Sequence, residues 1–475
     1  MAERKDVILP PEEVEKQKRV IEDISYINEL EYQTKGYTKR AFVETYGCQQ
    51  NVSDSEILSG MLQEMGYDLA SSKEGVDLII YNTCAVRENA ELKVFGNLGA
   101  LKHVKAKNPE MIICVCGCMM QQKEVAEQIR KKYKHVDLVF GTHSLYYFPT
   151  LLKKVLVEKT NVVDVRDTDG AIAEDYPVVR GEGPSAWVSI MYGCNNFCSY
   201  CIVPYVRGRE RSRSKEAILE EIKNIASDGY KEVTLLGQNV NSYGKDLDEN
   251  YDFADLLSDV CKINGIERIR FMTSHPKDIS DKLIDTMAEN EKICKQLHLP
   301  VQAGNNRVLK VMNRKYTKEE YLEKIEKIKE KMPGITLTTD IIVGFPGETK
   351  EEFEDTIDVL KKVRYDTIFS FIYSKRKGTP AATMEDCLTH EEKKECFDRL
   401  LKVQDEISLA KNKEMLGKTV KILVEGRSKN DPTTLTGRTE GGKIVNFKGD
   451  IKDTGKFIDI KITDVRTWSL IGETI

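Results

Sequence analysis

Short apolar runs that alternate with amphipathic helical stretches dominate the first third of the chain. Residues 41–48, 77–84 and 111–118 have the pattern of buried strands that each end in a cysteine, and a helical pattern follows each of them. A fourth apolar run lies at residues 136–141. Buried strands that alternate with helices are typical of a parallel sheet. We therefore predict a parallel α/β sheet domain over residues 39–155.

A charged extension, residues 1–38, precedes this domain. After Pro10 and Pro11 the apolar positions recur at helical spacing, which predicts one amphipathic helix. Its apolar face consists of Val20, Ile21, Ile24, Ile27 and Leu30. We expect this face to pack on the following domain, and the alternative is a contact with a partner protein or with RNA.

A longer alternation of strands and helices fills the middle of the chain, residues 180–410. Six apolar runs predict strands, at residues 186–193, 232–237, 268–273, 295–300, 336–345 and 367–373. Six strand–helix units fit an open (β/α)6 partial barrel, which is a relative of the eightfold barrel whose chemistry lies at the carboxyl ends of its strands.

The last segment, residues 413–475, changes to short strands separated by turns. That pattern predicts a small all-β barrel. The segment contains 12 Lys and Arg residues against 9 Asp and Glu residues, whereas the whole chain has a net charge of -5. A local excess of positive charge is expected of a weak nucleic-acid platform.

The composition indicates in which cellular compartment the protein is expected and which role its cysteines are expected to have. The 475 residues show no signal-peptide pattern, and the longest apolar run, ten residues from Met111, is shorter than the ~18 needed to span a membrane. We expect a cytoplasmic protein without a membrane partner. In that reducing compartment twelve cysteines favour metal ligation over disulfides.

Three cysteines, Cys194, Cys198 and Cys201, form a C-x3-C-x2-C pattern in a loop after the first strand of the central domain. Three thiolates are one fewer than a structural zinc or a fully ligated cubane requires, and the next Cys or His is Cys261. A [4Fe–4S] cluster held in this way keeps one iron open. The alternatives are a zinc loop that borrows a distant ligand and three unrelated buried cysteines. The loop resembles that of radical S-adenosylmethionine (SAM) enzymes, in which SAM binds the open iron and is cleaved to a 5′-deoxyadenosyl radical.

A second set, Cys48, Cys84 and Cys118, stands at the predicted carboxyl ends of successive strands, 36 and 34 residues apart. Parallel α/β sheets bind their ligands at that edge. The set therefore predicts a second cluster with an open iron, and the alternative is three buried structural cysteines. Cys114 and Cys116 lie inside their strand and are predicted to be core residues.

Two groups of residues are candidate ligand contacts. Behind a cluster that binds SAM, the loop residue Tyr200 and the glycine-containing turns after two strands are expected to contact SAM, through Tyr200, Gly237, Gln238 and Gly344. Alternating arginines beyond the cluster loop predict phosphate contacts, with a solvated or salt-bridged strand as the alternative. Together with two residues of the last segment, the candidate RNA contacts are Arg207, Arg209, Arg211, Arg213, Arg438 and Lys443.

The order of the three domains resembles the radical SAM methylthiotransferase family, whose C-terminal barrel is called TRAM. The stretches that carry the resemblance are residues 44–51, 299–317, 371–382 and 428–447, and they are most similar to the MiaB-type tRNA methylthiotransferases. The resemblance implies that the first cysteine set holds the radical-generating cluster and that Cys48, Cys84 and Cys118 hold an auxiliary cluster. Cys118 matches the family motif at the third auxiliary position, and Cys116 does not.

The resemblance also implies a reaction, the addition of a methylthio group to C2 of N6-isopentenyladenosine beside the tRNA anticodon. C2–H has no acidic proton and no leaving group, which explains the need for a radical. The implied cofactors are two [4Fe–4S] clusters and SAM, which acts as methyl donor and radical source. The implied partners are tRNA, a low-potential electron donor of the flavodoxin or ferredoxin type, and a sulfur source. No catalytic side chain is expected beyond the cluster ligands.

Other functions remain open at this point. The nearest alternatives change only the substrate, to a threonylcarbamoyl-adenosine tRNA or to an aspartate of a ribosomal protein. A different class would be an Fe–S RNA-binding regulator without turnover. An open iron at both sites argues against that class, since a carrier would use four cysteine ligands for each cluster.

Overall fold

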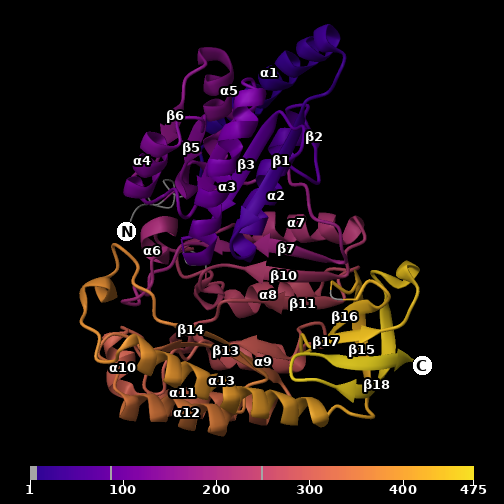
Figure 1. The fold of residues 1–475 in the computed structure, drawn as a ribbon. Helices are drawn as coiled ribbons and strands as arrows, with labels where there is room; N and C mark the ends of the chain where they lie inside the picture. Colours follow the sequence, from indigo (N-terminus) through magenta and orange to yellow (C-terminus); the bar gives the residue numbers. More distant parts are fainter. Residues whose placement is uncertain (1–7, 86–87, 169, 248–249, 430) are drawn as a thin grey trace. The chain divides into compact units, whose positions relative to one another are not determined.

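The computed structural model describes residues 8–85, 88–168, 170–247, 250–429 and 431–475. Its contacts divide the chain into two compact units, whose helices and strands are drawn in Figure 1. Unit 1 comprises Met1–Gly181, Tyr192–Asn195 and Ile202–Arg213, and unit 2 comprises Glu182–Met191, Asn196–Cys201 and Ser214–Ile475. The cysteine loop of the central domain is therefore shared, because Cys194 belongs to unit 1 whereas Cys198 and Cys201 belong to unit 2.

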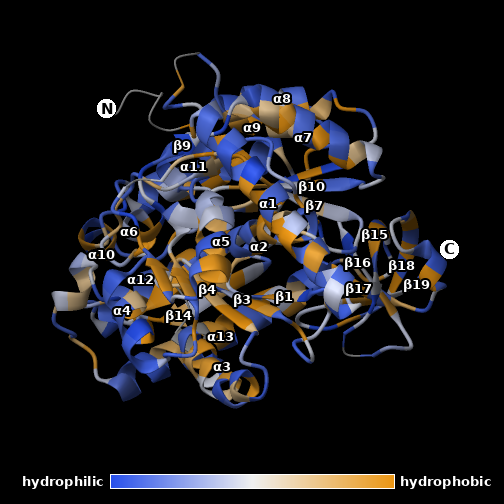
Figure 2. Ribbon diagram, turned by 90° about the horizontal axis from the view of Figure 1, so that it is seen from above, coloured by the Kyte–Doolittle hydropathy of each residue, from blue (hydrophilic) through white to orange (hydrophobic). Residues whose placement is uncertain are grey.

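Unit 1 contains a six-stranded sheet in the order β2-β1-β3-β4-β5-β6, and every pair in it is parallel. The strands are β1 (Arg40–Tyr46), β2 (Asp68–Leu69), β3 (Leu78–Thr83), β4 (Ile112–Gly117), β5 (Leu138–Phe140) and β6 (Val162–Asp164). Strands β3 and β4 are buried at every position, and both are coloured as hydrophobic over much of their length in Figure 2. The predicted parallel sheet is confirmed. The edge strands β2 and β6 were not predicted, and β6 lies beyond residue 155.

Helices cover both faces of this sheet, each over its own apolar cluster. They are α1 (Pro11–Lys35), α2 (Gln49–Glu64), α3 (Glu88–Lys107), α4 (Lys123–Lys132) and α5 (Phe148–Glu158), with the 3-10 turn η2 (Thr142–Tyr147). The short helix α6 (Val203–Arg207) contributes Val206 to a separate small cluster with Cys118.

The face of helix α1 that packs on the rest of unit 1 contains both apolar and polar side chains. Ile21 and Ile24 are buried as predicted, but Leu30 is exposed. The buried Gln17 accepts a hydrogen bond from Thr150 Oγ1 at 3.0 Å. Apolar spacing alone could not reveal this polar contact, because its partner lies 133 residues away.

Unit 2 begins with the six predicted strands, arranged as two parallel sheets in the orders β11-β10-β7 and β12-β13-β14. A bridge between Ile269 and Ile293 links them. The strands are β7 (Ser185–Ser189), β10 (Glu232–Leu236), β11 (Arg268–Phe271), β12 (Gln296–His298), β13 (Thr336–Val343) and β14 (Thr367–Ile372). The cysteine loop lies between two short strands, β8 (Met191–Tyr192) and β9 (Arg211–Ser212), and Tyr192 and all of β9 belong to unit 1. The predicted (β/α)6 partial barrel is confirmed.

In the described part of unit 2, seven helices accompany these strands. They are α7 (Lys215–Ser227), α8 (Phe253–Cys261), α9 (Asp281–Glu289), α10 (Asn306–Val311), α11 (Lys318–Lys331), α12 (Lys350–Val363) and α13 (His390–Lys413), with 3-10 turns η3 (Val240–Ser242), η4 (Pro276–Asp278) and η5 (Pro380–Thr383). Helices α11, α12 and α13 each begin with a capping box, in which an N-terminal threonine pairs with a glutamate three residues later. The threonines are Thr317, Thr349 and Thr389. No helix in the part of the chain described here is long and apolar enough to cross a membrane.

The last strands of unit 2 close into the predicted small barrel, in the order β15-β16-β17-β19-β18. They are β15 (Thr419–Arg427), β16 (Leu435–Thr439), β17 (Ile444–Phe447), β18 (Phe457–Val465) and β19 (Leu470–Thr474), with the 3-10 turn η6 (Ile451–Asp453). One end of the barrel is bound to β11. Arg268 donates to the carbonyl oxygens of Lys421 and Arg438, both at 2.9 Å. Arg270 donates to the carbonyl oxygens of Thr439 and Glu440, at 2.8 and 2.7 Å.

Candidate metal centres

Three cysteines of unit 1 follow neighbouring strands at one edge of its sheet. The registers pair Tyr46 with Thr83 and Thr83 with Gly117. Cys84 and Cys118 come directly after the last two of these residues, and Cys48 comes two residues after Tyr46. Cys84 and Cys118 are buried, and Cys48 is half-buried. The sheet therefore brings the predicted auxiliary ligands to its carboxyl edge.

An asparagine pair fixes the loop that carries Cys48. Asn51 Oδ1 accepts from the Cys48 backbone amide at 3.4 Å, while Asn51 Nδ2 donates to Asn82 Oδ1 at 3.1 Å. In return, Asn82 Nδ2 donates to the Asn51 carbonyl oxygen at 2.8 Å. Sequence reasoning did not single out either residue, although Asn51 lies within the stretch that resembles the methylthiotransferases.

A buried arginine contacts this site from the segment after the cysteine loop. Arg207 Nε donates to Cys118 Sγ at 3.1 Å, and Arg207 Nη2 donates to Asp54 Oδ2 at 2.6 Å. Burial raises the pKa of the Cys118 thiol to about 12; the Arg207 charge opposes this rise, and Cys84 and Cys48 add to it. Thiols bind metal only as thiolates, so a bound cation would supply the charge that deprotonation requires here.

The part of the cysteine loop that lies in unit 2 is held by α10 and the residues after it. Ser199 Oγ donates to the Val311 carbonyl oxygen at 2.9 Å. Asn313 Nδ2 donates to the carbonyl oxygens of Asn196 and Phe197, at 3.2 and 2.9 Å. These bonds fix the backbone on both sides of Cys198.

A second buried arginine contacts Cys198. Arg314 Nη1 lies 3.4 Å from Cys198 Sγ and 3.4 Å from the hydroxyl of Tyr200. Arg314 Nη2 donates to the Pro300 carbonyl oxygen at 2.7 Å, and Nε donates to the Tyr316 hydroxyl at 2.9 Å. These partners include no carboxylate. Since buried charges need a counter-charge, the guanidinium fits an anionic thiolate cluster at Cys198.

The donor chemistry of both sets fits iron–sulfur clusters, because each set consists of three cysteines with a guanidinium beside one of them. In the described ranges no three His, Cys, Asp or Glu side chains are arranged as a metal-ligand group. The assignment of all six cysteines as cluster ligands therefore stays a prediction. Cys114 and Cys116 are fully enclosed in the apolar cluster on one face of the sheet, as expected of core residues.

Three predicted SAM contacts lie within the cysteine loop or directly after β10. Tyr200 is half-buried, with its hydroxyl beside Arg314. Gly237 is buried against the side chain of Met191, which leaves no room for a Cβ atom at that position. The close approach at Gly237 is thus explained by protein packing. SAM contact at Tyr200, Gly237 and the half-buried Gln238 stays a prediction.

The turn after β13 contains Gly344, the fourth residue predicted to contact SAM. Its φ of +67° favours glycine, and a Cβ atom would meet the side chain of Lys393. Its amide donates to Glu348 Oε2 at 2.7 Å, and the Phe345 amide donates to the same oxygen at 3.3 Å. Glu348, which sequence reasoning missed, therefore occupies the backbone donors that this turn was expected to offer to a ligand.

The alternating arginines after the cysteine loop are mostly internal, and RNA contact at these four residues stays a prediction. Arg207 and Arg211 are buried, and Arg211 Nη1 donates to the Arg209 carbonyl oxygen at 2.9 Å. Arg213 forms an ion pair with Glu174 at 2.7 Å. Only Arg209 among the four is exposed. The alternative of a salt-bridged segment describes this run better, since alternation along the chain does not show which partners the fold supplies.

The two predicted RNA contacts of the small barrel also have protein partners. Arg438 Nε lies 2.7 Å from Glu425 Oε1. Lys443 Nζ lies 2.8 Å from Asp366 Oδ1 and 2.9 Å from Asn412 Oδ1, and only 16% of its side chain is exposed. Lys443 therefore joins the barrel to the rest of unit 2, and phosphate contact at Arg438 and Lys443 stays a prediction.

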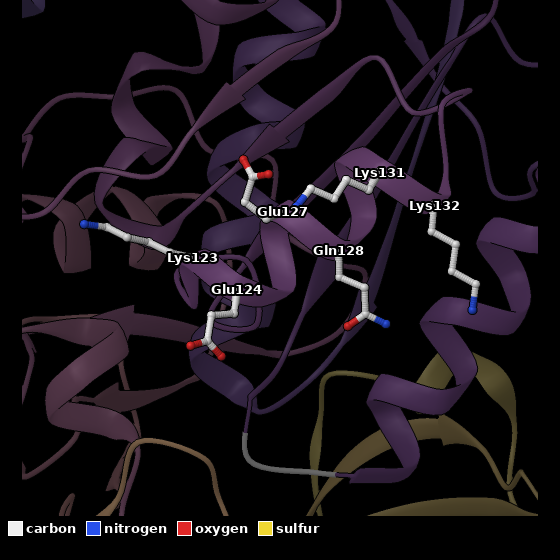
Figure 3. Close-up of a pocket in the computed structure, with 6 residues that line it drawn as sticks. All are labelled: Lys123, Glu124, Glu127, Gln128, Lys131 and Lys132. Carbon is white, nitrogen blue, oxygen red and sulfur yellow. The ribbon is translucent and has the colours of Figure 1, made fainter.

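A surface hollow in unit 1 lies along α4 and is separate from the cysteines. Figure 3 shows its six lining side chains, which all come from this one helix. They are Lys123, Glu124, Glu127, Gln128, Lys131 and Lys132. A solvated face of charged side chains like this one has no chemistry in common with a cluster site.

In a comparison with known proteins, three family models match successive parts of the chain. The Radical SAM superfamily matches residues 188–360, and the TRAM domain matches residues 413–475. An uncharacterized protein family, UPF0004, matches residues 40–141, which contain Cys48, Cys84 and Cys118.

Relatives named tRNA-2-methylthio-N(6)-dimethylallyladenosine synthase match over the whole length. The protein of Acetivibrio thermocellus is 57% identical and covers 100% of this chain and 98% of its own. The protein of Alkaliphilus oremlandii is 54% identical and covers 100% of both chains. The protein of Clostridioides difficile is 55% identical and covers 99% of both.

Among solved structures, the radical SAM methyltransferase TsrM from Kitasatospora setae has a similar fold. Its complex with tryptophan and a SAM analogue gives a TM-score of 0.53 at 13% identity, and the match covers 73% of this chain and 75% of that one. At that identity the likeness concerns the fold alone. Full-length identity above 50% decides the relationship, and the chain belongs to the radical SAM family of tRNA-2-methylthio-N(6)-dimethylallyladenosine synthases.

Proposed function

We propose that this enzyme adds a methylthio group to C2 of N6-isopentenyladenosine (N6-dimethylallyladenosine) beside the anticodon of tRNA. The observation that carries the proposal is the full-length similarity to synthases whose name states both the methylthio product and the dimethylallyl base. The TRAM domain supports RNA as the carrier of the substrate.

The two cysteine sets have separate roles in this proposal. When bound at Cys194, Cys198 and Cys201, a [4Fe–4S] cluster supplies an open iron for SAM and the electron that cleaves it. We infer a second [4Fe–4S] cluster that Cys48, Cys84 and Cys118 would hold, and its open iron would bind the sulfur to be transferred. A low-potential electron donor of the flavodoxin or ferredoxin type and a sulfur source complete the reaction.

The protein's own residues position these groups and exclude water. Hydrogen bonds from Ser199 and Asn313 hold the cysteine loop of unit 2, and the Asn51–Asn82 pair holds the loop of unit 1. Four of the six predicted ligands are buried, which suits radical chemistry, because a carbon radical must be shielded from water and side reactions. No general acid or base is needed at C2, since no acidic proton leaves.

Nucleoside mass spectrometry of tRNA tests the function. Deletion of the gene should remove the 2-methylthio derivative and leave N6-isopentenyladenosine in its place. The intact gene should restore the product, Cys118→Ala should not, and the matched core variant Cys116→Ala should. Unchanged nucleosides after deletion would refute the proposal. Loss of a methylthio group from threonylcarbamoyl-adenosine would instead assign the sister substrate.

A further inference from the structure

The Arg207 side chain divides its hydrogen bonds between a carboxylate and a predicted cluster ligand. Its Nε donates to Cys118 Sγ at 3.1 Å, and its Nη2 donates to Asp54 Oδ2 at 2.6 Å. The side chains of Arg207 and Asp54 are 6% and 4% exposed. Arg207 ends α6, only six residues after Cys201 in the chain.

A purely structural role explains this geometry poorly. A buried ion pair often contributes little net stability, because desolvation of the two charges offsets their attraction. Arginine and a carboxylate commonly pair through two parallel N–H groups, but here one N–H group is directed at sulfur. A small buried cavity of about 20 Å³ adjoins the pair and is lined by Arg207, Asp54, His143, Tyr146 and Tyr192. The pair therefore lies in a polar region where one charge faces the cysteine site.

We propose that Arg207 is a positioning residue that sets the reduction potential of the cluster held by Cys48, Cys84 and Cys118, and that Asp54 moderates its effect. Hydrogen bonds to ligand sulfur and the nearby net charge are the two levers by which a protein tunes such a cluster. A cation stabilises the reduced, more negative form and raises the potential. The Asp54 anion, which accepts from Nη2 of the same guanidinium, lowers it. This proposal rests on the second cluster of the proposed function.

Redox titration followed by electron paramagnetic resonance tests the proposal in a background where Cys194, Cys198 and Cys201 are alanine. Iron analysis of this full-length background should give about four irons per chain. Arg207→Met should shift the potential to more negative values, and Asp54→Asn should shift it to more positive values. Arg207→Lys keeps the charge but cannot reach both partners with its single nitrogen, so its potential should lie between those of Arg207→Met and the background. The matched control is Arg130→Met, an exposed arginine on α4 that pairs with Glu127.

Opposite shifts of the reduction potential in Arg207→Met and Asp54→Asn would distinguish tuning of the cluster from a purely structural role. If the pair only supported the fold, Arg207→Met and Asp54→Asn would both lose iron, with no opposite change of potential. Unchanged potentials, or shifts in one direction, would overturn the proposal. If Arg207→Met holds no iron, Asp54→Asn and Arg207→Lys still decide, because their expected shifts have opposite signs. A background without iron would instead refute the second cluster and leave the radical SAM assignment intact.

Discussion

At the scale of single residues, each cysteine set has one buried arginine, and the two arginines differ in their surroundings. Arg207 shares its charge with Asp54 as well as with Cys118. Arg314 is bound to hydroxyl and carbonyl oxygens and to Cys198. A cation that lacks a carboxylate partner acts more strongly on a nearby anion than a paired one does. The two predicted clusters therefore experience different electrostatic environments, as two clusters with different tasks require.

Among single residues, Glu348 leads to a prediction about how the folding stability depends on pH. Burial raises the pKa of its carboxyl group to about 7, although hydrogen bonds from the Gly344 and Phe345 amides oppose the rise. Because the folded state holds the proton more tightly than the unfolded state, Glu348 favours folding below pH ~4.5, and this contribution is lost as pH rises to ~7. The loss amounts to about 3 kcal/mol at most.

Glu348→Gln removes this titration while its amide oxygen still accepts from the turn. Urea unfolding of the full chain should show that the wild type loses stability between pH 5 and pH 7.5 relative to the variant. The control is Glu351→Gln, an exposed position on α12. Parallel pH profiles for the wild type and Glu348→Gln would show that the carboxyl group has no raised pKa.

At the scale of elements, apolar periodicity was enough to predict the parallel sheet, all six strands of the partial barrel and the small barrel. The cysteine edge was predictable too, because equivalent positions after parallel strands meet at one edge, as Cys84 and Cys118 do. The partners of charged side chains were not predictable. Arg207, Arg213 and Lys443 look like phosphate contacts in sequence, but their carboxylate partners are distant in the chain. The sequence around an arginine carries no signal for such a partner.

The attachment of the small barrel to β11 was likewise invisible in the sequence. Arg268 and Arg270 bind backbone carbonyl oxygens of the barrel, and every residue type provides such an oxygen. Arg270 also pairs with Glu232 at 2.9 Å, and both side chains are nearly buried. The barrel is thus held by a buried charge network on the neighbouring domain.

Replacement of Arg270 tests this attachment. Arg270→Met leaves Glu232 buried without its cation, which costs about 3–5 kcal/mol, and removes the bonds to Thr439 and Glu440. Trypsin should then cleave the α13–β15 connection near Lys413 and Lys418 faster than in the wild type. Arg438→Gln is the matched control, because its carbonyl oxygen accepts from Arg268 whichever side chain the residue has. Equal cleavage rates for Arg270→Met and wild type would show that these bonds do not hold the barrel.

At the scale of the whole molecule, the charge of the small barrel is divided between its two ends. The end with Thr439 and Glu440 is bound to β11. At the opposite end, the registers pair Arg427 with Leu435 and Leu435 with Phe447, so Arg427 and Lys448 lie close together. The net charge of -5 for the chain excludes general attraction of RNA, so a local surface has to provide it.

The free end of the barrel is accordingly where tRNA phosphates should bind. Arg427, Lys429 and Lys448 are exposed there, unlike Lys443. Replacement of all three by Gln should weaken tRNA binding and lower the slope of log affinity against log salt by about 2 to 3, since each phosphate contact contributes about 0.9. Exposed Lys418 and Lys461 neighbour the bound end, so their replacement by Gln, which removes two charges, is the control. SAM cleavage without tRNA should be equal in all three proteins. If both variants bind tRNA with the wild-type salt slope, the surface that binds tRNA phosphates lies outside the barrel. Arg209 is then the exposed arginine to replace next.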